Sequence, residues 1–299
     1  MKRQITFAIK AKNETIIMVE KSGSFSMPKN RLRTSMNPMQ LQQELYLWKK
    51  NVKTLAADLD GTIYKGNLLL PKVKETYDFL KNIGINIIFL TNNSSQTPAE
   101  IKSKLEKLLK VEINIHNIVT PLNVLQTVEE LVNSKVYIFG SSNIENYIKK
   151  FNKNIVPIDK AESIIIGRKE EVDFNLVNEI ASFILSGKKA FCLNKDLTFP
   201  TEKGEKPGNG AVVKILEELT NMKVESLGKP DQFFINYLKN YNYEINYVIG
   251  DRVDTDIILA NKLKIESILI RSGVTNFMNA ENATYVIDEF DELIKILFK

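Results

Sequence analysis

Side chains that can act on a phosphate group occur in four short segments of this 299-residue chain. The segments are Asp58–Thr62, Thr91–Ser95, Gly228–Pro230 and Gly250–Asp256, each expected at or near the end of a short apolar run. In an open α/β sheet, ligands bind just beyond the carboxyl ends of the strands. Carboxylates, a hydroxyl, an amide and a lysine gathered there could carry out metal-assisted phosphoryl transfer through an aspartyl-phosphate.

Alternating strands and helices are expected to bring these segments to one sheet. The first expected strands and helices lie at residues 54–57, 72–82, 85–90 and 98–109. Proline is favoured in the first turn of a helix, which supports a helix start at Pro98. The alternation predicts an α/β fold with a Rossmann-like parallel-sheet core, formed by residues 53–132 and 205–299.

A second alternating series begins near Val136. Its expected strands and helices lie at residues 136–139, 143–149, 163–166, 174–185 and 189–193. This series predicts a compact α/β cap, residues 133–204, inserted into the core.

The order and spacing of the four segments resemble those of phosphatases of the haloacid-dehalogenase superfamily. The stretch Pro200–Gly204, followed by Pro207–Ala211, resembles the nitrophenylphosphatase-type, NagD-like branch, which carries a class IIA cap. The resemblance covers roughly Lys53 to the C-terminus. It implies a HAD-like catalytic core, with the cap inserted between the second and third motifs.

Two aspartates in the first segment have the types and spacing needed for hydrolysis. Asp58 is the expected nucleophile, because a carboxylate can attack phosphorus and form a mixed anhydride that water later hydrolyses. The resemblance implies that Asp60 protonates the departing alkoxide and then takes a proton from the attacking water. Relatives that conserve the phosphoenzyme for transport carry threonine there, and dehalogenases lack this acid, so Asp60 favours hydrolysis.

The resemblance also implies a Mg²⁺ cofactor. Its expected protein ligands are an Asp58 carboxylate oxygen, the Asp60 backbone carbonyl and Asp251, since Mg²⁺ prefers oxygen ligands. Asp256 is expected to orient these ligands. Asp254 is interpreted as a helix N-cap, a position that suits aspartate.

Three further residues are expected to bind the phosphate. The Thr91 hydroxyl and the Asn92 backbone amide can donate hydrogen bonds to phosphate oxygens, and Lys229 can supply a compact positive charge. In the cap, the loop containing Asn194 and Asp196 could contact the leaving group. A solvent-exposed loop is the alternative for that segment.

The N-terminal residues differ in charge from the rest of the chain. Residues 1–53 hold 11 Lys and Arg against 3 Asp and Glu, whereas the remainder holds 30 against 33. Residues 1–52 are therefore treated as a basic extension, either a hairpin plus a helix or a partly disordered arm. A basic arm can bind nucleic acid, but solvated charge without a partner is the usual case.

Cellular location is suggested by two features. No apolar run approaches the roughly 18 residues that span a bilayer, so no membrane partner is expected. The single cysteine, Cys192, excludes an intramolecular disulfide and fits a reducing cytoplasm. A cytoplasmic protein is predicted.

Two other nucleotide-handling classes are disfavoured. The Gly-Lys pairs at residues 187–188 and 228–229 lack the upstream glycine of a P-loop. The Gly208–Gly210 segment has Val213 where a dinucleotide fingerprint needs glycine or alanine.

Taken together, these features predict a Mg²⁺-dependent hydrolase of small phosphate monoesters. Its partner would be a small phosphorylated metabolite of unspecified kind, and a homodimer is possible. Nucleic acid is not expected as a partner. The alternative is a catalytically weak protein of the same fold, with a binding or regulatory role carried by its basic N-terminal segment.

Overall fold

The chain forms two compact units, residues 1–52 and 53–299. The computed structural model describes residues 5–8, 17–20, 54–201, 204–271 and 282–297. In the first unit, β1 (Ile5–Ala8) pairs antiparallel with β2 (Ile17–Glu20), in the two runs where a hairpin was considered. The helix considered for this extension, at residues 40–50 of the sequence, and the rest of the unit lie outside the described residues.

A six-stranded sheet forms the centre of the second unit, and all its pairings are parallel. Its strands, in spatial order, are β16 (Tyr285–Ile287), β15 (Glu266–Ile270), β14 (Ile245–Gly250), β3 (Thr54–Asp58), β6 (Asn86–Leu90) and β7 (Ile118–Val119). The central strand β3 is buried along its whole length, as expected for a parallel sheet covered on both faces. The α/β, Rossmann-like core predicted from the sequence is confirmed.

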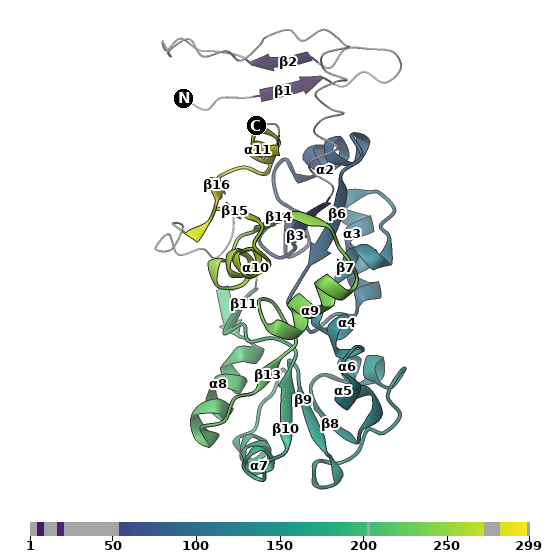
Figure 1. Ribbon diagram of the computed structural model, residues 1–299, viewed down its shortest axis with the longest axis vertical. Coiled ribbons are helices and arrows are strands. Elements are labelled where there is room, and N and C mark those ends of the chain that lie inside the picture. The colour runs from purple at the N-terminus through teal and green to yellow at the C-terminus, as the bar shows by residue number, and fades with distance from the viewer. Residues whose placement is uncertain (1–4, 9–16, 21–53, 202–203, 272–281, 298–299) are drawn as a thin grey trace. The chain divides into compact units, whose positions relative to one another are not determined.

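Helices cover this sheet, with α3 contacting β7 and α10 contacting β15 (Figure 1). The helices are α2 (Val73–Asn82), α3 (Pro98–Leu109), α4 (Pro121–Leu125), α9 (Gln232–Asn240), α10 (Ile258–Leu263) and α11 (Leu293–Leu297). At the start of α3, Thr97 and Glu100 form a capping box, and Pro98 occupies the first turn. Among the described residues, no helix has the length and apolar character needed to cross a membrane.

A smaller four-stranded parallel sheet forms the cap, below the core in Figure 1. Its strands, in spatial order, are β13 (Glu225–Ser226), β10 (Lys189–Cys192), β9 (Ser163–Ile166) and β8 (Val136–Phe139). The helices that accompany it are α5 (Glu129–Asn133), α6 (Ser142–Ile148), α7 (Phe174–Leu185) and α8 (Asn209–Thr220).

The cap layer continues beyond residue 204, where the sequence placed its end. Helix α8 packs on α7, and its buried Val213 and Leu216 belong to the same apolar cluster as Ile166 and Val177. Strand β13 then pairs with β10 at the edge of the sheet. Residues 209–226 therefore pack with the cap. The apolar periodicity of α8 alone does not show whether this helix packs on the cap or on the core.

Short elements complete the second unit. Two small antiparallel hairpins are formed by β4 (Tyr64–Lys65) with β5 (Leu68–Leu69), and by β11 (Thr198–Thr201) with β12 (Gly204–Pro207). Single helical turns lie at Ile115–Asn117, Ile158–Lys160, Val253–Ile257 and Phe290–Glu292.

One apolar cluster joins the core to the cap. It contains Ala56 and Ile88 from the core sheet together with Ile138, Ile165 and Phe191 from the cap sheet. Burial of such side chains contributes roughly 1.5–3 kcal/mol each. The two sheets are thus held together by apolar packing close to the place where the polar segments meet.

Candidate active site

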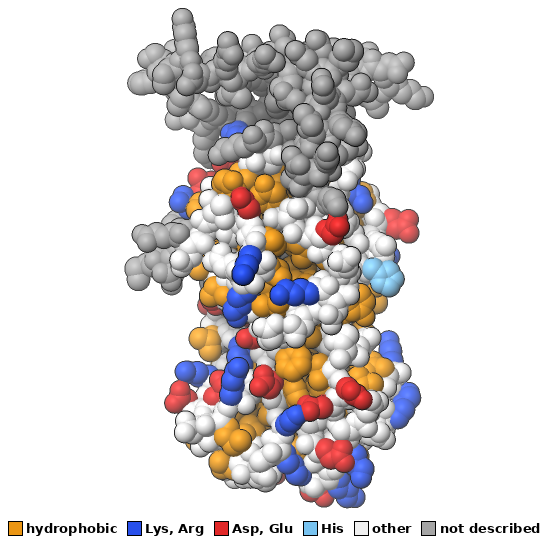
Figure 2. Space-filling view, in the orientation of Figure 1, with side chains coloured by type: hydrophobic (Ala, Val, Ile, Leu, Met, Phe, Trp, Pro, Cys, Tyr) orange, Lys and Arg blue, Asp and Glu red, His pale blue; other side chains and the backbone are white. Residues whose placement is uncertain are grey.

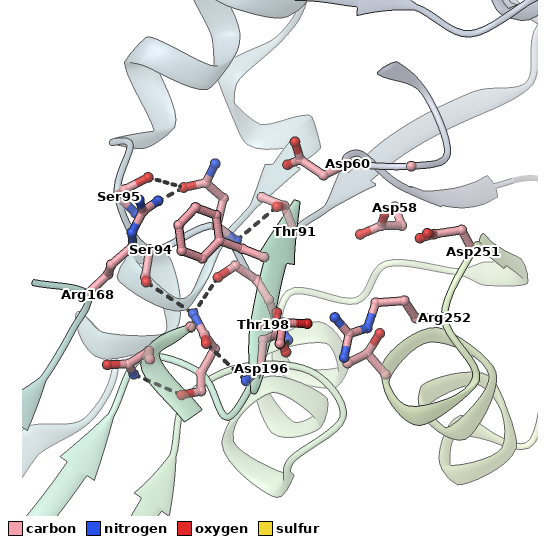
Figure 3. A pocket seen from close by; sticks show the side chains of 18 of the residues that line it. Asp58, Asp60, Thr91, Ser94, Ser95, Arg168, Asp196, Thr198, Asp251 and Arg252 are labelled. Atoms are coloured by element: carbon pink, nitrogen blue, oxygen red, sulfur yellow. Dashed lines mark hydrogen bonds between the residues drawn. The ribbon is translucent and has the colours of Figure 1, made fainter. Parts of the chain in front are cut away.

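A cavity of about 480 Å³ lies where the strand ends of the two sheets face each other. Three lining residues follow or end core strands: Asp58 ends β3, Thr91 follows β6 and Asp251 follows β14. Arg168 and Asn194 come from the segments that follow the cap strands β9 and β10. Figure 3 shows Asp58 and Asp251 close together on one side of the cavity, with Asp60 above them. The structure thus brings the four predicted segments together.

Lys229 lies between two buried carboxylates. Its Nζ is 2.6 Å from Asp58 Oδ1, 2.7 Å from Asp256 Oδ1 and 3.3 Å from the Leu90 carbonyl oxygen, to all of which it donates. Burial alone would lower the pKa of Lys229, but Asp256 and Asp58 outweigh this effect and raise it. The ammonium therefore stays charged inside the site.

The nucleophile candidate, Asp58, is buried beside this ammonium. Burial raises the pKa of its carboxyl group well above the ordinary value, and Lys229 acts in the opposite direction. The neighbouring Asp256 and Asp251 carboxylates raise the pKa further. A cation near these three acids would favour their ionised forms.

Three carboxylates in the cavity have the arrangement of a metal site. Asp58, Asp251 and Asp256 each place one carboxylate oxygen within 4.8 Å of the others, and all three are buried. An all-oxygen set of this kind suits Mg²⁺, which usually binds one or two carboxylates together with waters and phosphate oxygens. The sequence placed Asp256 only in an orienting role, but its carboxylate lies in the set.

Glycines let the backbone approach these acids closely. A Cβ atom on Gly61, whose φ is +94°, would lie 2.3 Å from Asp251 Oδ2. A Cβ atom on Gly250 would lie 2.2 Å from Asp256 Oδ2. Both positions therefore need glycine if the aspartates are to keep their places.

Asp60 also lines the cavity, apart from the three-carboxylate set. Burial raises the pKa of its carboxyl group, whereas the positive charges of Lys104 and then Lys229 act in the opposite direction. A raised pKa suits a group that must hold a proton before passing it to a leaving oxygen.

The side chain of Asn92 holds the backbone of Lys229. Asn92 Oδ1 accepts from the Lys229 N–H at 2.8 Å, and Asn92 Nδ2 donates to the Lys229 carbonyl at 3.0 Å. Its neighbour Thr91 accepts a hydrogen bond from the Asn93 N–H through Oγ1 at 3.0 Å. Thr91 and Asn92 both line the cavity beside Lys229, so the predicted phosphate-binding residues are gathered in one place.

The cap residues Asn194 and Asp196 line the cavity and bind the core loop. Asn194 Nδ2 donates to the Asn92 carbonyl at 2.7 Å and to Ser94 Oγ at 3.0 Å. Asp196 Oδ1 accepts from Asn92 Nδ2 at 2.9 Å. These bonds join cap to core, a role that the sequence did not suggest for either residue.

Asp254 does not cap a helix, in contrast to its interpretation from the sequence. It lies inside the turn Val253–Ile257, and its carboxylate accepts from Arg252 Nε at 3.0 Å and Nη2 at 2.6 Å. Arg252 lines the cavity directly after Asp251. Its place inside the fourth segment, Gly250–Asp256, was a signal in the sequence that it lies at the site.

Arg168 was missed, although it lines the cavity together with Thr198 and Phe199, which follow the cap loop that the sequence had placed near the site. Arg168 Cζ lies 3.6 Å from the centroid of the Phe199 ring. Neither residue falls in a recognisable motif. Phe199 reaches the cavity because β11 pairs with β12, and Arg168 reaches it because it follows the end of β9.

Comparisons with known proteins agree with this site. A family described as haloacid dehalogenase-like hydrolase matches residues 55–153, and one described as HAD-hydrolase-like matches residues 226–293. An acid sugar phosphatase from Staphylococcus saprophyticus is 28% identical over 258 residues, covering 84% of this chain and all of the relative.

Two solved structures share the fold. A p-nitrophenyl phosphatase from Archaeoglobus fulgidus has a TM-score of 0.73 and 24% identity, covering 82% of this chain and 99% of its own. A glycerol phosphate phosphatase from Mycobacterium tuberculosis, solved in complex with magnesium, has a TM-score of 0.69 and 24% identity, covering 82% and 77%.

The fold and the matched sequence regions define the class: the chain belongs to the haloacid-dehalogenase-like hydrolases. It is a phosphatase, and the solved structures that share its fold include a p-nitrophenyl phosphatase and a putative NagD protein.

Proposed function

We propose that this protein hydrolyses small phosphate monoesters through an aspartyl-phosphate on Asp58, with Mg²⁺ as cofactor. The observation that carries the proposal is the gathering of Asp58, Asp251 and Asp256 around Lys229 in one cavity. The set combines a carboxylate nucleophile, a cation for the phosphoryl group and oxygen ligands for a metal.

In the first half-reaction, an Asp58 carboxylate oxygen attacks phosphorus. The new bond joins this oxygen to phosphorus, and the bond between phosphorus and the leaving-group oxygen breaks. Asp60 gives its proton to the departing alkoxide, for which its raised pKa is suited. Lys229, already bonded to Asp58, balances the negative charge that gathers on the phosphoryl oxygens.

In the second half-reaction, water attacks the phosphorus of the mixed anhydride. Asp60 takes a proton from this water, the bond to Asp58 breaks, and inorganic phosphate and the free carboxylate result. The same residue thus acts first as acid and then as base.

The donor set fits Mg²⁺. Asp58, Asp251 and the Asp60 backbone carbonyl would hold the ion, with Asp256 beside them. When bound, Mg²⁺ would reduce the repulsion between an anionic nucleophile and an anionic phosphate. The magnesium complex of the Mycobacterium tuberculosis enzyme supports this assignment.

The substrate is proposed to be a small phosphorylated metabolite. The cavity volume, about 480 Å³, lies in the usual range for small-molecule sites. Sugar phosphates are one candidate, supported by the naming of the Staphylococcus relative as an acid sugar phosphatase. A cytoplasmic location and a homodimer stay predictions.

The test is release of phosphate from p-nitrophenyl phosphate with Mg²⁺, and again after its removal with a chelator. We expect turnover that needs both Mg²⁺ and Asp58, so that Asp58→Asn abolishes it. Asp60→Asn should slow turnover severely and let the phosphoenzyme accumulate, which intact mass spectrometry detects. The matched control is Asp78→Asn, because Asp78 is a solvent-accessible residue of α2 paired with Lys74.

Normal hydrolysis by a folded Asp58→Asn protein would refute the nucleophile assignment. Metal-independent turnover would refute the cofactor assignment. The alternative role, binding through the basic N-terminal segment, is disfavoured because every position needed for turnover carries a competent residue. Figure 2 shows basic and acidic side chains interspersed over the described part of one face.

A further inference from the structure

Arg168 lies on the cap side of the cavity, and the reaction proposed above gives this cation no role. It follows β9 and lines the 480 Å³ cavity together with Asp58 and Lys229. It also lines a neighbouring cavity of about 470 Å³, with Phe199 at the boundary of both. In Figure 3 it lies beside Ser94 and Ser95, on the opposite side from Asp251 and Arg252. With the transferred phosphate at Asp58, as proposed above, the rest of the substrate would extend toward this side of the cavity.

The guanidinium of Arg168 lies over an aromatic ring. Its Cζ is 3.6 Å from the centroid of Phe199, in hairpin strand β11. Arginine stacks on aromatic faces in this way, and its N–H donors then lie in the plane of the guanidinium, parallel to the ring. Those donors match the geometry of a carboxylate or a phosphate.

Among the described residues, Arg168 has no ion pair like those of Lys229 and Arg252, two of the other three cations that line the cavity; the third is Lys65. Lys229 pairs with Asp58 and Asp256, and Arg252 pairs with Asp254. Within the described parts of the chain, no carboxylate lies within ion-pair distance of Arg168. Glu170, in the same loop, acts electrostatically on Arg168, and Glu205 of β12 is among the acids that line the same cavity.

We propose that Arg168 binds a second anionic group, a carboxylate or a second phosphate, on the leaving group of the substrate. The inference rests on the proposed phosphatase function and narrows its substrate class to phosphate esters of acids or bisphosphates. A half-buried arginine is still charged, since the guanidinium does not lose its proton in proteins. An anionic group therefore gains a charge-assisted pair that a neutral leaving group lacks.

Matched ligand pairs test the proposal without relying on turnover. In the Asp58→Asn protein, calorimetry measures binding of 3-phosphoglycerate against glycerol 3-phosphate, which differ by a carboxylate in place of a hydroxymethyl group. A second pair, fructose 1,6-bisphosphate against fructose 6-phosphate, tests a second phosphate. In at least one pair, we expect the ester with the second anionic group to bind about tenfold more tightly, or better, than the ester without it.

The role of Arg168 is then isolated with variants. Arg168→Gln should bring the ratio of affinities within such a pair close to one. Arg168→Lys should retain part of the preference for the ester with the second anionic group. The control is Lys188→Gln, since Lys188 also lies over a cap ring, Phe183 at 4.8 Å, but lines neither of these two cavities. In active protein, kcat/KM for the same pairs should change mainly through KM.

Equal affinities within both pairs, or no binding of any of the four esters, would overturn the inference. So would a ratio that survives Arg168→Gln. Turnover of p-nitrophenyl phosphate by the unmodified enzyme tests the proposed function separately, because this ester has no second anionic group. Thermal melting shows that each variant is folded before its ratio is compared.

Discussion

The ammonium of Lys229 lies 2.6 Å from Asp58 Oδ1, in a place where its side chain is 1% exposed. The same ammonium is 2.7 Å from Asp256 Oδ1. One buried cation thus neutralises part of the charge of two buried carboxylates, and one of these is the expected nucleophile, Asp58. Stability and catalysis should therefore depend on the same side chain.

Replacing Lys229 with methionine should affect both properties. We expect kcat for p-nitrophenyl phosphate to fall by at least about 10²-fold, because a charge aimed at the phosphoryl group is lost. The free energy of unfolding should fall by about 3–5 kcal/mol, because Asp58 and Asp256 stay buried without their partner. Denaturant unfolding at neutral pH measures the second effect.

Lys214→Met is the control for Lys229→Met. Lys214 pairs with Glu218 on the solvent-exposed face of α8, and its loss should cost less than about 1 kcal/mol. If Lys229→Met and Lys214→Met destabilise the protein equally, the buried ion pairs do not have the importance argued for them.

Asn92→Asp should weaken the site with almost no change in side-chain size. The amide donates to the Lys229 carbonyl and to Asp196, and an ionised carboxylate would face both acceptors instead. We expect a loss of about 1–3 kcal/mol in stability together with a lower kcat. Asn175→Asp, at an exposed position in the first turn of α7, should leave both properties unchanged.

Gly250→Ala should inactivate the enzyme. The added Cβ would lie 2.2 Å from the Asp256 carboxylate, which must move and take its hydrogen bond to Lys229 with it. Gly140→Ala is the matched case, since the nearest atom to its added Cβ would be 3.5 Å away, an ordinary contact. Equal activity of the two variants would show that the position of Asp256 is not critical.

Cys192 should be unreactive in the folded protein. It is fully buried, and this burial raises the pKa of its thiol to about 12. At pH 8 only about one thiol in 10⁴ would be ionised, and the thiolate is the reactive form. Labelling with Ellman's reagent should be absent in native protein and reach one thiol per chain in guanidinium. Immediate labelling of native protein would contradict the buried position.

Glu100 should make the stability depend on acid pH. Hydrogen bonds from the Thr97 N–H and then from Asn143 lower the pKa of its carboxyl group. A lowered pKa in the folded state gives stability that is present above the unfolded-state value and lost as the pH falls through the folded-state value. Because solvent screens this exposed carboxylate, Glu100→Gln should cost only about 0.5 kcal/mol or less at pH 7, and the difference should shrink towards pH 3. A constant difference would contradict the assignment.

Most elements near the site could be predicted from the sequence, because their local patterns are strong. Helix α7 has the predicted bounds, and β3 and β6 agree with the predicted strands to within one residue at each end. Polar residues at the ends of parallel strands then had to meet at one edge of the sheet. For this reason the sequence alone places Asp58, Thr91 and Asp251 together.

The remaining features depend on contacts between distant segments. Strand β13 has two residues and no periodicity of its own, and only its pairing with β10 assigns it to the cap. The roles of Asn92 and Asn194 depend on carbonyl groups more than a hundred residues away. Arg168 faces the cavity because Phe199 supports it, and no local pattern encodes that stacking.

The double hydrogen bond between Asn92 and the Lys229 backbone has a mechanical consequence. Lys229 comes only three residues after β13, the last strand of the cap, so the chain leaves the cap at a point bonded to the core. If the cap moves, the chain between β13 and Lys229 must therefore bend, because the two hydrogen bonds with Asn92 hold the Lys229 backbone on the core. The ammonium would then keep its place on Asp58 while the opposite wall, with Arg168, moves. Opening of the enzyme to exchange substrate and product would thus leave the phosphate half of the site assembled.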